Sequence, residues 1–288
     1  MFGTLLRRLV LAVAVGAGAS LGSAVAARQL LVAQARLARE TIGKPLGKEA
    51  HRSDGTYKKK YGRPVQLLLL GDSIAAGLGA DTAEETLGAH LARRVAKRTR
   101  RTVVLRTGAH VGAETRMLRA QLAALPPDYR ADVAVILVGG NDVTHRIRAA
   151  ESRDHLVEAV DALRATGTEV VVGTCPDLGA LTALPQPLRT LASRGSRQLA
   201  ALQREVVLER GGWAVSLAEV VGPFFVAQPD SMFAVDRFHP SGAGYRRTAK
   251  AVLPSVLAAL GHSDELPHGH YAAVTALPSA ARRSHGVG

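Results

Sequence analysis

The sequence predicts an α/β fold in which a doubly wound parallel sheet lies between layers of helices. Two observations predict this class. Short apolar stretches alternate with longer stretches of helical periodicity between Val65 and Leu260, and the apolar stretches are hydrophobic at successive positions. A strand that is apolar on both faces is expected where helices cover both sides of the sheet.

About five strands and five main helices are predicted in this domain. The strands are VQLLLL (65–70), TVVLRT (102–107), VAVILVG (133–139), EVVVGTC (169–175) and WAVSL (213–217). The helices are predicted over 84–98, 114–125, 149–166, 194–209 and 242–260. No repeat of fixed period occurs, so residues 65–260 are interpreted as one domain.

The first 40 residues predict an N-terminal signal or membrane-anchor segment with a helical extension. Leu9 to Ala27 is a run of 19 uncharged residues, and the AVA triplet at Ala24–Ala26 fits a signal-peptide cleavage site. A secreted protein and a membrane-anchored protein of the cell envelope are both compatible with this segment. Arg7 and Arg8 precede it, whereas three arginines and two lysines follow it by residue 48, a charge count that favours a cytoplasmic domain and conflicts with simple export, so the side of the membrane stays undecided.

The segments on either side of the predicted domain lack sustained periodicity. Residues 41–64 are polar and rich in glycine and lysine, which is typical of a linker. Residues 261–288 are expected to form a flexible tail. A GASLG stretch at Gly18–Gly22 matches the nucleophile-elbow pattern, but it lies inside the targeting segment and not between a strand and a helix. It is assigned no catalytic role.

Composition excludes several classes of function. The net charge is +13, but only 4% of the residues are aromatic, so base-stacking surfaces are scarce and no nucleic-acid partner is expected. Cys175 is the only cysteine, which rules out an intramolecular disulfide and a thiolate zinc cluster. The strand-to-helix turn at GDSIAAGL lacks the lysine of a phosphate-binding loop, and the histidines show no metal-binding spacing. We therefore expect no cofactor and no metal.

Glycines and residues with reactive or polar side chains follow the predicted strands, at the edge where ligands bind to open α/β sheets. Ser73 follows the first strand within Gly71-Asp72-Ser73, and the second is followed by GAHVGAET, which contains Gly108 and Gly112. The third ends in Gly139-Gly140-Asn141-Asp142, and VDRFHPSGAGY, with Asp236 and His239, precedes the last helix.

Each residue type has a role in acyl transfer. A serine hydroxyl needs a neighbouring base, for which His239 is the candidate, and Asp236 can orient the ring. The backbone N–H groups of Ser73 and Gly112 and the side-chain amide of Asn141 can bind a developing oxyanion. His145 either faces this cleft or lies on the surface at the start of the next helix.

Together, GDS, the following glycine block, GGND and DRFHPS resemble the four sequence blocks of the SGNH hydrolases, also called GDSL-type esterases and lipases. The resemblance covers roughly residues 65–260. It implies Ser73, Asp236 and His239 as catalytic triad, Gly112 and Asn141 with Ser73 in the oxyanion hole, and a three-layer α/β/α, flavodoxin-like fold. Ile74 replaces the leucine of GDSL, and Val111 stands where a serine is common, so Gly108 stays an alternative to Gly112.

The predicted function is that of a serine esterase or lipase that hydrolyses carboxylic esters through an acyl-enzyme intermediate on Ser73. The substrate is expected to be a small-molecule, lipid or sugar ester. An acyltransferase or deacetylase acting on a sugar or lipid hydroxyl uses the same intermediate and stays open. A non-catalytic envelope binding module is an alternative of another class, and it should lack a member of the triad.

Overall fold

A computed structural model describes residues 25–43 and 45–273 of the chain. Most of the predicted signal or anchor segment, the GASLG stretch and the last part of the predicted tail lie outside the described residues. Among the helices that are described, none combines the length and the apolar character that a membrane crossing requires.

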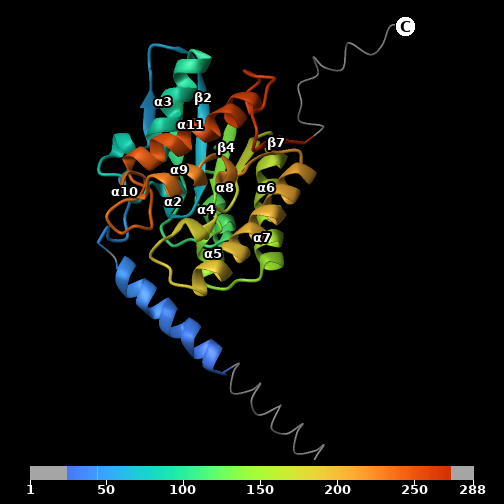
Figure 1. The fold of residues 1–288 in the computed structure, drawn as a ribbon. Coiled ribbons are helices and arrows are strands. Elements are labelled where there is room, and N and C mark those ends of the chain that lie inside the picture. The colour runs from blue at the N-terminus through green and yellow to red at the C-terminus, as the bar shows by residue number, and fades with distance from the viewer. Residues whose placement is uncertain (1–24, 44, 274–288) are drawn as a thin grey trace, which may run out of the picture.

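The core of the fold is a seven-stranded sheet in the order β1-β3-β2-β4-β5-β6-β7 (Figure 1). Its five central strands are parallel. They are β3 (Arg101–Thr107), β2 (Gly62–Gly71), β4 (Val133–Leu137), β5 (Glu169–Gly173) and β6 (Trp213–Val215). Numbered by position along the chain, these five have the spatial order 2-1-3-4-5 of flavodoxin-like sheets. The predicted fold class is thus confirmed.

Two short strands at the edges correct the predicted boundaries. β1 (Gly55–Tyr57) pairs antiparallel with β3, although it lies in the stretch predicted as a linker (41–64). β7 (His270–Ala272) pairs antiparallel with β6, although it lies in the predicted tail (261–288). Both have three residues, too few to show a hydrophobic period. They form because the edge of a sheet presents unpaired backbone groups that an adjacent segment can satisfy.

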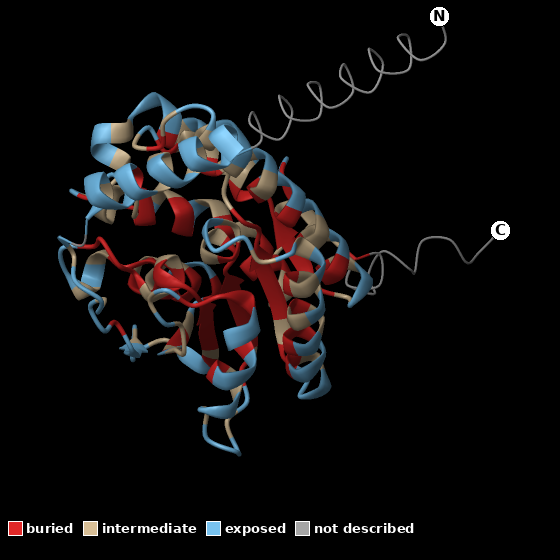
Figure 2. Cartoon of the chain, turned by 90° about the horizontal axis from the view of Figure 1, so that it is seen from below, coloured by how far each residue is buried: buried red, intermediate tan, exposed pale blue. Residues whose placement is uncertain are grey.

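Helices cover both faces of the sheet, as the apolar strands predict. On one face, α3 (Leu87–Thr99) and α11 (Gly242–Ala259) pack on Leu67 and Leu69 of β2. On the other face, Leu68 and Leu70 of the same strand pack on α4 (Leu118–Ala123), α6 (Ala149–Ala165) and α7 (Leu188–Glu209). All four leucines are fully buried, and Figure 2 shows the buried strands between helices with exposed outer surfaces. The unbroken leucine run thus reflects burial on both faces.

Short helices connect the main elements. α2 (Ser73–Ala76) and α5 (Gly140–Thr144) directly follow β2 and β4, while α8 (Leu217–Val220), α9 (Gly222–Ala227) and α10 (Pro229–Met232) precede α11. Three single-turn helices are η1 (Ala83–Glu85), η2 (Thr115–Met117) and η3 (Leu178–Ala180). Residues 25–42 form a further helix, drawn in blue in Figure 1 at the end of the molecule where α5 lies.

Candidate active site

Ser73 lies at a sharp turn between β2 and α2. Gly71 has φ +128°, and a Cβ atom at this position would lie 1.8 Å from the backbone oxygen of Leu137 on the neighbouring strand. Only glycine fits so close to another backbone. The Asp72 side chain then caps α2 by accepting a 2.9 Å hydrogen bond from the Ile74 N–H. As a result, Ser73 begins the helix with its own N–H directed away from the helical ladder.

A buried glutamine, which the sequence analysis does not identify, fixes this turn. The Gln121 side chain accepts a hydrogen bond from the Gly71 N–H (2.9 Å) and donates one to the Gly71 carbonyl (2.8 Å). Gln203 holds the neighbouring strand ends in the same way, by accepting from the Cys175 N–H (2.7 Å) and donating to the Val138 carbonyl (2.9 Å). A single glutamine in a helical stretch carries no sequence signal for such a role.

The structure brings Ser73, His239 and Asp236 into one hydrogen-bonded chain. The His239 Nε2 atom lies 2.9 Å from the Ser73 Oγ, although the two residues are 166 positions apart in the sequence. The Nδ1 atom of the same ring lies 2.6 Å from the Asp236 Oδ2. Because an ionised carboxylate only accepts hydrogen bonds, the ring proton belongs on Nδ1, and Nε2 is free to accept the serine proton.

The Asp236 carboxylate is held in place by its own loop. Its Oδ1 atom accepts hydrogen bonds from the backbone N–H groups of Phe238 (3.0 Å) and His239 (2.9 Å). Burial by itself would raise the pKa of Asp236, but the hydrogen bonds from the His239 ring and from these two N–H groups outweigh burial and lower the pKa below its usual value. Asp236 is therefore the ionised partner that a protonated histidine requires.

The triad is largely shielded from solvent. Ser73 is 6% exposed, and the side chains of His239 and Asp236 are 15% and 4% exposed. Asp72, next to the serine, is buried more deeply, and burial raises the pKa of its carboxyl to about 7. Low exposure strengthens electrostatic interactions within the site.

The candidate donors for a developing negative charge are the backbone N–H groups of Ser73 and of Gly112 or Gly108, and the side chain of Asn141. The Gly108 N–H is engaged by the Leu69 carbonyl at 2.8 Å, so this alternative is not available as a donor. The Gly112 N–H and the Ser73 N–H have no acceptor among the residues that the structure describes. Gly112 has φ +81° and, like Ser73 and Asn141, lines the cavity that contains His239. The geometry therefore favours Gly112 over Gly108.

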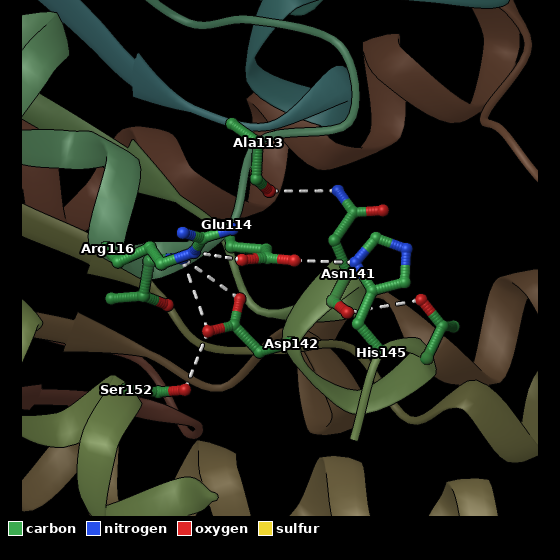
Figure 3. Close-up of polar contacts among 9 residues, drawn as sticks. Ala113, Glu114, Arg116, Asn141, Asp142, His145 and Ser152 are labelled. Atoms are coloured by element: carbon green, nitrogen blue, oxygen red, sulfur yellow. Dashed lines mark hydrogen bonds and ion pairs between the residues drawn. The ribbon is translucent and has the colours of Figure 1, made fainter. Parts of the chain in front are cut away.

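The segment after β3 and helix α5 are linked by three polar contacts, which Figure 3 shows. The Asn141 Nδ2 donates to the Ala113 carbonyl at 2.9 Å, and its second N–H has no acceptor within residues 25–43 and 45–273. The Asp142 carboxylate accepts from the Thr115 N–H (3.1 Å) and from the Ser152 hydroxyl (2.6 Å). These contacts fix Asn141 relative to Gly112.

The third contact is a hydrogen bond between Glu114 and His145. The Nδ1 atom of His145 lies 2.7 Å from the Glu114 Oε1, and Arg116 also binds this carboxylate. Both partners lower the pKa of Glu114, first through hydrogen bonding to Arg116 and then to His145. His145 ends α5 and is half exposed, yet it lines the cavity. His145 therefore faces the cavity, as one of the two alternatives predicts, but it does not begin the next helix, since α6 starts at Ala149.

Cys175 has no part in this arrangement. It is fully buried, and burial raises the pKa of its thiol well above the usual value, so the unreactive protonated form dominates.

A hydroxyl, a base with an oriented ring, an ionised carboxylate and free N–H donors together can activate a serine and stabilise a tetrahedral oxyanion. This is the chemistry of acyl transfer. The pattern is recognised by geometry, because unrelated folds contain it in different chain orders.

The chain is similar to known proteins in sequence and in fold. The sequence profile of the GDSL-like lipase/acylhydrolase family matches residues 69–247. The chain is 40% identical over 278 residues to a GDSL-like esterase of Mycobacterium tuberculosis, an alignment that covers 91% of this chain and 87% of the relative.

Solved structures with the same fold are more distant. An α/β hydrolase from the metagenome of Lake Arreo has 21% identity and a TM-score of 0.55, with 70% of this chain and 97% of that chain covered. An acetylxylan esterase of Geobacillus stearothermophilus has 19% identity and a TM-score of 0.52, with 71% and 97% covered. A lipase/acylhydrolase of Enterococcus faecalis has 22% identity and a TM-score of 0.52, with 66% and 93% covered. The sequence profile and the curated relative show that this chain is an enzyme of the GDSL-like lipase/acylhydrolase family.

Proposed function

We propose that this enzyme is a serine esterase that hydrolyses carboxylic esters through an acyl-enzyme intermediate on Ser73. The observation that carries the proposal is the continuous chain from the Ser73 Oγ through both nitrogens of His239 to Asp236, with distances of 2.9 and 2.6 Å. A non-catalytic binding module on this fold would have no need for a complete and oriented triad.

In the first half-reaction, the Ser73 Oγ attacks the ester carbonyl carbon while His239 Nε2 takes the hydroxyl proton. The carbonyl oxygen becomes an oxyanion, which the N–H groups of Ser73 and Gly112 and the free N–H of Asn141 can bind. When the C–O bond to the alcohol breaks, His239 returns the proton to the leaving oxygen. Ser73 then carries the acyl group as an ester.

In the second half-reaction, water attacks the acyl-enzyme, and His239 takes a proton from it. Collapse of the second tetrahedral intermediate releases the carboxylic acid and restores the Ser73 hydroxyl with the proton from His239. Asp236 stays ionised throughout and stabilises the imidazolium. If a sugar or lipid hydroxyl replaces water, the same residues catalyse acyl transfer, and if the acyl group is acetyl, the reaction is a deacetylation.

The Ser73→Ala variant tests the proposal. We expect turnover of p-nitrophenyl acetate to fall to the level without enzyme, while circular dichroism and thermal melting stay close to those of the wild type. Mass spectrometry of the wild type mixed rapidly with substrate should show one acyl group on Ser73. Turnover by the alanine variant at the wild-type rate would refute the proposal. Reactions with an acetylated xylooligosaccharide as the substrate test for deacetylation. Parallel reactions with and without glycerol as the acyl acceptor separate hydrolysis from transfer.

We also propose that the segment Leu9–Ala27 attaches the enzyme to the membrane or directs its export. Fractionation of cells that express the full chain should place it with membranes, or outside the cell with a shortened N-terminus. Recovery of the chain at full mass in the soluble cell fraction would contradict both forms of the proposal.

A further inference from the structure

A cavity of about 1670 Å³ opens on Ser73 and His239, and it extends well beyond them. Ligand pockets commonly measure about 300–1,000 Å³, so this cavity is larger than an acetyl ester requires. Most side chains that line it away from the triad are aliphatic. The extended part of the cavity therefore suits an apolar group.

The helix at residues 25–42 forms one wall of this cavity. Leu31, Ala35, Ala38 and Ile42 line it, and their spacing of four, three and four residues places them on one face of the helix. At 1.5 Å per residue, this face is about 16 Å long. The helix lies outside residues 69–247, which match the family profile. This wall therefore lies outside the part of the fold that the family profile covers.

Specific contacts dock the helix on the body of the enzyme. The Gln34 side chain accepts a hydrogen bond from the Leu188 N–H at 3.2 Å and donates one to the Gln186 carbonyl. Ala38 is 3% exposed and packs with leucines 178, 181 and 184, which precede α7. Polar contacts to backbone groups together with a buried alanine define one position of the helix on the enzyme.

The wall of the cavity outside this helix is also aliphatic. It consists of Leu181, Leu184, Leu188 and Leu191 in and before α7, together with Val143 and Ile147 in and after α5. An alkyl chain between these two surfaces would lose contact with water along its length. Each methylene buried in this way is expected to improve kcat/KM by up to about fourfold.

We propose that the helix at residues 25–42 is part of the substrate site and that the cavity takes a medium or long aliphatic chain of the ester. This inference rests on the proposed serine esterase function. The chain occupies the space between Ala35 and the leucines of α7, and the ester carbonyl lies at Ser73. The helix thereby sets the preference for chain length.

The test compares two alanines on opposite faces of the same helix. Ala35 lines the cavity, whereas Ala33 is exposed on the outer side. For each variant, kcat/KM is measured with p-nitrophenyl acetate, butyrate, octanoate and palmitate. We expect Ala35→Trp to lower the ratio of kcat/KM for octanoate to that for acetate about tenfold, and Ala33→Trp to leave this ratio unchanged.

A second pair of variants removes volume instead of adding it. Leu31→Ala should lower the same ratio because it removes contacts with the chain, whereas the control Leu30→Ala, on the exposed face, should not. Equal ratios in inner-face and outer-face variants overturn the inference, as does an equal loss with acetate and octanoate. Ser73→Ala separates the two proposals: if it abolishes all turnover while the inner-face variants keep the wild-type ratio, only the role of the helix is refuted.

Discussion

The hydrogen bond between Glu114 and His145 gives a quantitative prediction for the proposed oxyanion hole. Three contacts join the segment of Ala113–Thr115 to α5, at 2.9, 2.7 and 3.1 Å. His145→Ala removes one of them and leaves the other two. A hydrogen bond to a charged group contributes about 1.5–3 kcal/mol, and the half-exposed side chain of His145 places this one at the lower end.

If the loss of this hydrogen bond weakens transition-state stabilisation by about 1.4 kcal/mol, kcat falls about tenfold. Direct removal of a donor by Asn141→Ala should cost more, about 10²–10³-fold in kcat. KM should change little in either variant, because the oxyanion exists only in the transition state. His145→Asn, whose amide can reach the position of Nδ1, should recover part of the loss.

The assay is a double-mutant cycle on kcat for p-nitrophenyl acetate. Because His145 acts by positioning Asn141 and Gly112, its removal should cost less in the Asn141→Ala background than in the wild type. His155→Ala is the control, since the Nδ1 atom of His155 lies 3.7 Å from the Glu158 carboxylate within α6. Three results would refute the reasoning. The kcat losses of His145→Ala and Asn141→Ala could be fully additive, the effect of His145→Ala could be confined to KM, or its loss of kcat could equal that of the control.

Two further predictions concern folding. Burial raises the pKa of Asp72 to about 7. Between about pH 4 and 7 the folded state therefore binds more protons than the unfolded state. Because of this difference, the Asp72 carboxyl lowers the free energy of unfolding as pH rises through that range. The free energy of unfolding of Asp72→Asn, measured in urea relative to the wild type, should therefore rise from pH 4 to pH 7, and a constant difference would contradict the burial argument. Gly71→Ala places a Cβ 1.8 Å from the Leu137 oxygen and should lower the free energy of unfolding by at least about 2 kcal/mol, whereas Gly167→Ala, whose Cβ meets nothing within 4 Å, should cost less.

The main elements of the fold could be predicted because each one buries a regular pattern. The run Leu67–Leu70 predicts a strand covered on both faces, and the structure packs its alternate leucines on opposite helical layers. β1 and β7 could not be predicted, because three residues hold no period and their pairing depends on which edge of the sheet lies nearby. The same holds for Gln121, whose two hydrogen bonds to Gly71 span 50 residues of sequence.

For the candidate site, the sequence by itself determined which residue types follow which strands: a serine, a glycine block, an asparagine and a DxxH pair. These are local properties, since turns, caps and strand ends depend on neighbouring residues. Only the tertiary structure decided that the His239 ring reaches Ser73 across 166 positions, that the Gly108 N–H is already engaged, and that a helix before the domain lines the cavity. Such contacts depend on the packing of distant segments, and no local pattern in the chain encodes them.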